Sequence, residues 1–207
     1  MQLCRNGGVS EDIILEKIEN DTFKLDKGTL TFCPVCNPLA HEKDQRYVDT
    51  NLNRMFGEFD KSNCGYETSI SDVLMGYIDE CDYLLDLHST HKPGDPVFVF
   101  SEAESGPIFE YAKALKVDNI FLDWKVVYHG EDYCTEAYAL KQGKIATTLE
   151  CGYHKDPATI NIAKNALYNI LAFLDMHKAS EVETITETKT PNIYRFETCV
   201  YREDGDV

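Results

Sequence analysis

Two short runs of apolar residues in this chain lead into ionisable side chains. Residues 81–87 read CDYLLDL and residues 144–153 read KIATTLECGY, and both runs are rich in branched or aromatic residues. Runs of this length and composition predict buried β-strands. His88 follows the first run, and Glu150 lies near the end of the second. We therefore expect both residues at the carboxyl ends of buried strands.

The pattern of apolar residues in the rest of the chain predicts alternating helices and strands. Helical spacing of apolar positions predicts helices over residues 11–19, 67–80, 107–116 and 156–178. Short apolar runs predict further strands at residues 29–36, 97–100 and 119–122. This alternation predicts an α/β fold in which helices cover both faces of a mostly parallel or mixed sheet.

His88 and Glu150 fall where open α/β sheets place their chemistry, just beyond the carboxyl ends of strands. A carboxylate there is costly to desolvate unless it is paired, bound to a metal or used in proton transfer. If the two strands are parallel, the two side chains suit a metal ligand beside a general base. Taken singly, each has a plainer interpretation: a histidine hydrogen-bonded to a loop, and a glutamate in an exposed salt bridge.

A polar loop follows the expected strand at residues 29–36. It carries Arg46, Asn53 and Arg54 among few apolar residues. Guanidinium groups bind carboxylates in a bidentate manner that lysine cannot copy. Because adjacent residues of a strand face opposite ways, Asn53 and Arg54 can contact one ligand only if the backbone bends there. A loop of this charge is also typical of ordinary solvated surface.

The segments RYVDTNLNRMF, DLHST and LECG, in this order, resemble the succinylglutamate desuccinylase and aspartoacylase family of zinc-dependent hydrolases. The resemblance runs from about Gly28 to Gly152. It implies a three-layer, carboxypeptidase-like (phosphorylase/hydrolase-like) α/β fold with a mixed central sheet. It also implies cleavage of the amide bond of a small-molecule N-acyl amino acid by metal-activated water.

The resemblance assigns roles to individual residues. His88 would be a zinc ligand, and Glu150 would be the general base that activates the zinc-bound water. Arg46 would stabilise the oxyanion, while Asn53 and Arg54 would hold the free carboxylate of the substrate. Donors aimed at developing negative charge are often the largest single contribution to catalysis. The usual DLNR motif of the family reads NLNR in this chain.

The metal ligands depart further from the family pattern. The family takes two more zinc ligands from an early HxxE motif, but this chain has no HxxE and no histidine before His41. A catalytic zinc site normally has three protein ligands. The other conceivable donors are Cys4, Glu11, Asp12, His41, His91, His129 and His154. We therefore expect an N-terminally shortened family member, or alternatively an inactive relative that binds a small carboxylate through Arg46, Asn53 and Arg54.

The expected domain organisation is a catalytic domain over residues 1–178, followed by a linker and the start of a truncated β-rich domain over residues 179–207. The linker is rich in threonine and acidic residues. A single strand-like segment follows it, which must pair with the main sheet, pair with another chain, or fray.

The chain has 207 residues and a formal net charge of −16, which disfavours nucleic acids and anionic membranes as partners. It contains no apolar run of membrane-spanning length and no signal-peptide pattern. We therefore expect a cytoplasmic protein whose partner is a small molecule. A homo-oligomer is compatible with this interpretation.

Eight cysteines are spaced irregularly along the chain, and a cytoplasmic protein keeps its cysteines reduced. Cys33 and Cys36 form a CPVC sequence, which resembles a redox pair or half of a zinc site. Redox pairs of this type lie at the start of a helix, whereas this pair is expected to end a strand. The favoured interpretation is a pair of small buried hydrophobic residues.

Overall fold

The fold is known from a computed structural model, which describes residues 24–63, 65–128, 133–177 and 190–198. Its strands are β1 (Tyr83–Thr90), β2 (Phe98–Ser101), β3 (Asn119–Leu122), β4 (Ile145–Tyr153) and β5 (Asn192–Arg195). They form one sheet in the order β1-β4-β2-β3-β5. Strand β4 pairs in parallel with β1 and antiparallel with β2, so the sheet is mixed, as expected.

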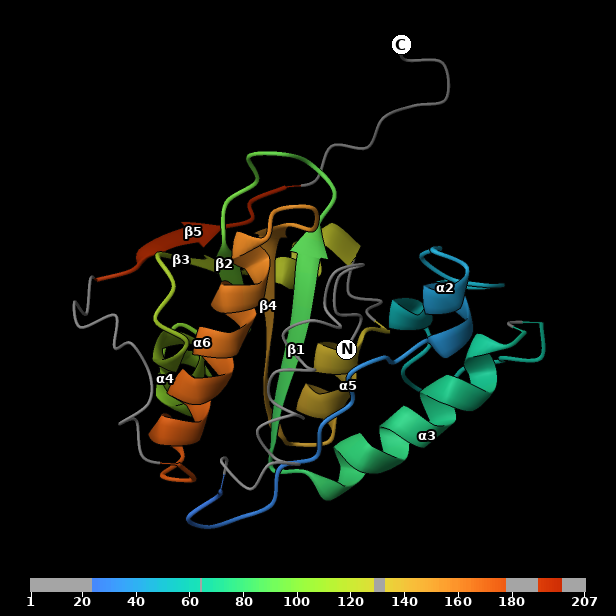
Figure 1. Ribbon diagram of the computed structural model, residues 1–207, viewed down its shortest axis with the longest axis horizontal. Helices are drawn as coiled ribbons and strands as arrows, with labels where there is room; N and C mark the ends of the chain where they lie inside the picture. Colours follow the sequence, from blue (N-terminus) through green and yellow to red (C-terminus); the bar gives the residue numbers. More distant parts are fainter. Residues whose placement is uncertain (1–23, 64, 129–132, 178–189, 199–207) are drawn as a thin grey trace.

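The helices form two outer layers. They are α2 (Pro38–Glu42), α3 (Glu67–Glu80), α4 (Gly106–Ala114), α5 (Thr135–Lys141) and α6 (Ala158–Phe173), with 3₁₀ turns η1 (Leu52–Arg54) and η2 (Trp124–Tyr128). Helices α4 and α6 cover one face of the sheet, and α3 and α5 lie on the other side (Figure 1). The predicted three-layer α/β architecture is confirmed.

The sheet separates two apolar clusters, and strand β4 contributes to both. Leu149 packs with Leu87 and Ile170 in the cluster beneath α4 and α6. Ala146 packs with Leu74 in the cluster on the α3 and α5 side. Because successive strand residues face opposite ways, the position after Leu149 points toward the α3 and α5 side. That position is Glu150.

Most predicted elements are confirmed with small shifts of their ends, but the strand predicted at residues 29–36 is wrong. Leu30 and Phe32 pack instead against Tyr168 and its neighbours on α6. Their segment has irregular backbone. Pro34 lacks a backbone N–H for a strand ladder, which is consistent with this conformation.

Two short helices, α2 and α5, were not predicted from the sequence. The helix predicted at residues 11–19 lies outside the described residues. Strand β5 pairs in parallel with β3, so this part of the C-terminal segment joins the main sheet. The domain boundary near residue 178 stays a prediction. None of the helices within the described ranges has the length and apolar character that crossing a membrane requires.

Candidate active site

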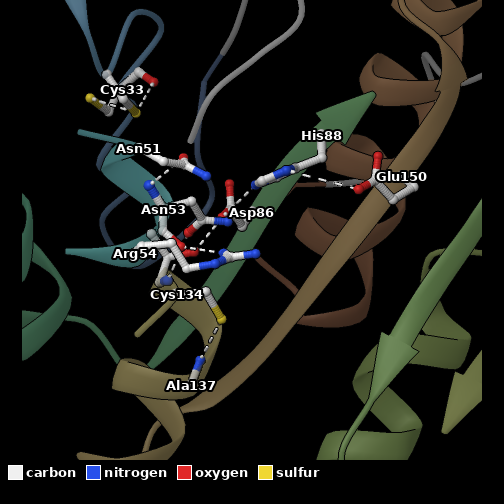
Figure 2. Close-up of polar contacts among 11 residues, drawn as sticks. Cys33, Asn51, Asn53, Arg54, Asp86, His88, Cys134, Ala137 and Glu150 are labelled. Carbon is white, nitrogen blue, oxygen red and sulfur yellow. Dashed lines mark hydrogen bonds and ion pairs between the residues drawn. The ribbon is translucent and has the colours of Figure 1, made fainter. Parts of the chain in front are cut away.

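His88 and Glu150 lie side by side near the carboxyl ends of β1 and β4. Strands β1 and β4 run parallel, and their register pairs these two residues directly. The His88 Nδ1 atom is 3.9 Å from Glu150 Oε1 (Figure 2). The prediction that the two strand ends bring an imidazole and a carboxylate together is therefore confirmed.

Asp86 holds the other side of the His88 ring. It lies two positions earlier in β1, so its side chain shares the face of His88. Its Oδ2 atom is 3.0 Å from His88 Nε2, and it also accepts a hydrogen bond from the Thr135 hydroxyl. Asp86 is only 1% exposed, so this hydrogen-bonded group is protected from water. The ring of His88 is thereby fixed with its Nδ1 atom toward Glu150.

The three ionisable groups shift one another's pKa values. Burial opposes ionisation of Asp86, but the His88 imidazole and the Thr135 hydroxyl hold the pKa of this carboxyl well below its usual range. Burial likewise disfavours the His88 cation, but Asp86 and Glu150 raise the pKa of the imidazole. Burial raises the pKa of Glu150, with His88 and Arg46 opposing the rise. The pKa of Glu150 is therefore closer to neutral pH than that of an ordinary glutamate, which is what the pKa of a general base requires.

His88 has the geometry of one metal ligand. Histidine ligands commonly donate their second ring N–H to a carboxylate, which is the relation between His88 Nε2 and Asp86. The Oε2 atom of Glu150 is buried and accepts no hydrogen bond from the described residues. Such an atom suits a polar ligand or water in this space.

A complete metal site is not formed by the part of the chain that the structure describes. No group of three or more His, Cys, Asp or Glu side chains there could hold a metal ion. His91 contacts Arg46, and His154 Nδ1 is 2.8 Å from the Thr90 carbonyl oxygen. Cys4, Glu11, Asp12 and His129 lie outside the described residues. The described residues thus include one histidine placed as a metal ligand would be, and they do not form a site with three ligands.

The turn η1 places Asn53 and Arg54 beside the strands. Asn51 caps this turn, its side-chain oxygen accepting from the Asn53 N–H at 3.2 Å, a role that the aspartate of the usual motif can also play. The backbone bend that would let Asn53 and Arg54 contact one ligand is therefore present. The Asn53 side chain accepts a hydrogen bond from the Thr135 N–H at 3.1 Å. Arg54 extends from η1 toward β1 (Figure 2).

Thr135 connects the two halves of the site. Its backbone N–H binds Asn53 and its hydroxyl binds Asp86, so one residue at the start of α5 links η1 to β1. Arg46 contacts His91, and its Nη1 atom is 3.1 Å from His91 Nε2. The positive charge of Arg46 also opposes the rise in the pKa of Glu150. The structure therefore links Asn53 to Asp86 through Thr135 and places Arg46 close enough to Glu150 for their charges to interact.

Glu67 holds the segment that carries the two arginines, residues 46–54, which we call the arginine loop. This carboxylate is fully buried at the first residue of α3. Its oxygens accept the backbone N–H groups of three successive loop residues, Val48 at 2.6 Å, Asp49 at 3.1 Å and Thr50 at 3.2 Å. The Asn37 side chain donates a further hydrogen bond at 2.9 Å.

Gly65 brings the arginine loop against the entrance to α3. Its φ of +69° is in the left-handed region, and a Cβ atom there would lie 2.2 Å from Asp49 Oδ2. The same carboxylate oxygen accepts the Tyr66 N–H at 2.8 Å. Position 65 therefore requires glycine both for its backbone conformation and for the close approach of Asp49.

Residues 13–177 match the family model described as the succinylglutamate desuccinylase/aspartoacylase catalytic domain. The chain belongs to this family. Over 77 residues it is 36% identical to a curated "probable aspartoacylase" from Prochlorococcus marinus subsp. pastoris. That match covers 34% of this chain and 26% of the relative, so the chain spans a small part of that protein.

Two solved structures share the fold of this chain. A succinylglutamate desuccinylase from Vibrio parahaemolyticus has a TM-score of 0.72 at 18% identity, covering 99% of this chain and 63% of that one. An ectoine utilization protein from Ruegeria pomeroyi, solved with bound product, has a TM-score of 0.67 at 18% identity, covering 90% and 57%. The chain therefore spans less than two thirds of these relatives.

Three polar residues of this family member's site were missed by sequence reasoning. Asp86 had a signal, because residues two apart on a strand share a face and it precedes His88 by two. Glu67 had only the general signal of an acidic residue in the first turn of a helix. Thr135 belongs to a helix that was not predicted, so its position beside η1 had no signal in the sequence.

The hydroxyl of Thr135 is expected to stabilise the folded chain. Thr135→Val removes the hydrogen bond to buried Asp86 but keeps the backbone bond to Asn53, so the free energy of unfolding should fall by about 1–3 kcal/mol. Urea unfolding measures this change. Thr135→Ser is the matched control, since it keeps a hydroxyl and should lose less than half as much. Equal losses in the two variants would contradict this role.

Proposed function

We propose that this chain carries the catalytic site of a zinc-dependent amidohydrolase that cleaves the amide bond of an N-acyl amino acid. The observation that carries this proposal is the pairing of His88 with Glu150 at one sheet edge. The site faces the arginine loop, to which it is hydrogen-bonded through Thr135. A cytoplasmic location and a small-molecule partner belong to the same proposal.

Glu150 is the general base in this proposal. Its raised pKa and its buried, unbonded Oε2 atom suit a carboxylate that accepts a proton from the attacking water. The same carboxyl then delivers the proton to the nitrogen atom of the departing amine. His88 is held by Asp86, so its ring stays oriented while the proton moves through Glu150.

The arginine loop supplies positive charge to an anionic substrate. Arg46 stabilises the oxyanion that develops when water adds to the amide carbonyl. Arg54 binds the free carboxylate of the amino acid through its planar guanidinium, and the Asn53 amide assists. The chain carries a net charge of −16, so these local cations must attract the substrate against an unfavourable overall field.

The zinc ion implied by the family would supply Lewis-acid polarisation of the reacting oxygen atoms when bound. His88 is the residue among the described ranges that would hold it. Because these ranges form no cluster of three ligands, each step above is assigned to side chains of the chain itself.

A second candidate function is metal-free binding of a small carboxylate through Arg46, Asn53 and Arg54. The incomplete ligand set of the described residues favours it. This function predicts that a chelator leaves the affinity for the ligand unchanged. It also predicts that the bound ligand is not hydrolysed.

Zinc titration by calorimetry, combined with hydrolysis assays on N-acetylaspartate and N-succinylglutamate, distinguishes the two candidates. Zinc uptake with turnover that a chelator abolishes supports the hydrolase. Binding of either compound without zinc uptake or turnover supports the carboxylate-binding protein. If the chain neither binds nor hydrolyses either compound, both candidates are wrong for these ligands.

Arg54→Ala is expected to weaken binding of N-acetylaspartate by about 10- to 100-fold, because a charge-assisted pair of hydrogen bonds is lost. Arg54→Lys should recover only part of the affinity, since an ammonium cannot form the bidentate contact. Arg195→Ala is the matched control, because Arg195 lies on the edge strand β5 in ion pairs with Glu104 and Asp123. Isothermal titration measures all three, and equal weakening by Arg54→Ala and Arg195→Ala would contradict the assignment.

A further inference from the structure

The thiols of Cys33 and Cys36 lie close together. The Sγ atom of Cys36 is 3.6 Å from that of Cys33 and 3.7 Å from the Cys33 carbonyl oxygen (Figure 2). Cys36 is buried, and Cys33 is half-buried. A disulfide bond is about 2.05 Å long, so bond formation requires the two sulfur atoms to approach by about 1.5 Å.

The pair does not end a strand, contrary to the expectation from the sequence. The backbone around it is irregular, and Cys36 directly precedes Asn37, the residue that caps α2.

The two thiols have different environments. Cys36 donates its hydrogen bond to the Cys33 sulfur, and this bond together with burial raises the pKa of the Cys36 thiol. Cys33 is the more exposed of the two residues, so its sulfur is the one that a disulfide in solution can reach, and the buried Cys36 sulfur is placed to resolve a mixed disulfide.

The pair is connected to the arginine loop by two routes. Cys36 packs in one apolar cluster with Met55 and Phe56, which directly follow that loop. The next residue, Asn37, donates a hydrogen bond to Glu67, the carboxylate that holds three backbone N–H groups of the loop. Movement of the Cys36 sulfur toward Cys33 therefore acts on both the packing and the hydrogen bonds of the loop.

We propose that Cys33 and Cys36 are a reversible dithiol–disulfide pair that reacts with small-molecule disulfides of the glutathione type and, when closed, loosens the arginine loop. This site is separate from the amide-hydrolysing site and does not depend on whether the chain hydrolyses any substrate. A disulfide that closes such a short loop removes little chain entropy, so it stays readily reducible.

The reaction proceeds by two thiol–disulfide exchanges. The Cys33 thiolate attacks one sulfur of oxidised glutathione, which forms a mixed disulfide and releases one glutathione thiolate. The Cys36 thiolate then attacks the Cys33 sulfur, which forms the Cys33–Cys36 bond and releases the second glutathione thiolate. Two electrons pass from the pair to the oxidant, and the two cysteine protons end on the two glutathione thiols.

Peptide mass mapping in glutathione redox buffers tests the pair. Trypsin releases residues 28–43 as one peptide that contains both cysteines and no others. After treatment with oxidised glutathione and alkylation, this peptide should lose two hydrogen atoms and regain them with reduced glutathione. Cys36→Ser should instead accumulate a glutathione adduct on Cys33. Cys81→Ser is the matched control, since the Cys81 thiol donates to the Ile78 carbonyl and should leave the closure unchanged.

Three outcomes would overturn the proposal that Cys33 and Cys36 form a reversible disulfide. The first is that peptide 28–43 keeps both thiols in excess oxidised glutathione. The second is a stable glutathione adduct in the wild-type chain, which would mean that Cys36 does not resolve it. The third is thiol reactivity that requires a chelator, which would mean that the two cysteines hold a metal.

Hydrogen exchange tests the effect on the loop. In the closed form, the backbone amides of residues 48–50 should exchange severalfold faster, because these are the amides bound by Glu67. The Cys33→Ser variant in the same oxidising buffer should show no such change. Unchanged exchange in a fully closed wild-type chain would overturn the link to the arginine loop.

Discussion

Glu67→Gln should lower the free energy of unfolding by about 3 kcal/mol, because donors of the arginine loop lose their acceptor at a fully buried carboxylate. One carboxylate oxygen accepts from Val48 and Asn37, and the other accepts from Asp49 and Thr50. A glutamine amide replaces one of these oxygens with an NH₂ group, which then faces two donors. Urea unfolding measures the loss. Glu80→Gln, at the exposed far end of α3, is the matched control and should change stability by less than about 0.5 kcal/mol.

The contribution of Glu67 should depend on pH. Burial opposes ionisation, but the hydrogen bonds from the loop backbone and Asn37 hold the pKa of Glu67 below its ordinary value of 4.5. The folded state therefore binds the proton less tightly than the unfolded state. The stabilisation is complete above the unfolded pKa and is lost as the pH falls through the folded pKa. The difference in the free energy of unfolding between wild type and Glu67→Gln should therefore be smaller at about pH 3 than at about pH 7. An equal difference at both pH values would contradict the stabilising role of the ionised Glu67 carboxylate.

Glu150→Gln should abolish most amide hydrolysis while leaving ligand binding intact. A glutamine cannot accept the water proton, so kcat should fall by about 10²- to 10⁴-fold. Binding of N-acetylaspartate should change little, because Arg54 and Asn53 hold its carboxylate in the proposed complex. Steady-state kinetics and calorimetry separate these two effects.

Asp95→Asn is the control for Glu150. The Asp95 charge contributes to the raised pKa of Glu150, yet Asp95 has no proposed contact with substrate. Its removal should change kcat by no more than a few-fold. A Glu150→Gln variant that retains wild-type turnover would remove this residue from the mechanism, whereas an equal loss in Asp95→Asn would indicate a general electrostatic effect.

The layers of the fold were predictable because they follow from local patterns. The apolar runs that became β1 and β4 and the helical spacing of α3 all carry a clear period. Residues 29–36 show the limit of such patterns. Their apolar side chains are buried against α6 without a strand ladder, so hydrophobicity predicted the burial but not the backbone conformation.

The charged half of the site was also predictable, because His88, Glu150 and the arginines fall in ordered motifs. The groups that hold these residues were not. Thr135 binds Asp86 across 49 positions of the sequence, and Glu67 binds the arginine loop across 17 to 19 positions. Such long-range hydrogen bonds depend on how the layers pack, and periodicity contains no information about that packing.

The anchoring of the arginine loop by Glu67 and Gly65 has a consequence for the proposed binding of a ligand. Hydrogen bonds from Val48, Asp49 and Thr50 to Glu67, and the close approach of Gly65 to Asp49, join the loop to α3 before any ligand arrives. The conformational entropy of the loop is therefore lost during folding and not on association. In the proposed function, the backbone that carries Arg46 and Arg54 is therefore preorganised, so that capture of a carboxylate requires no closing motion of this segment.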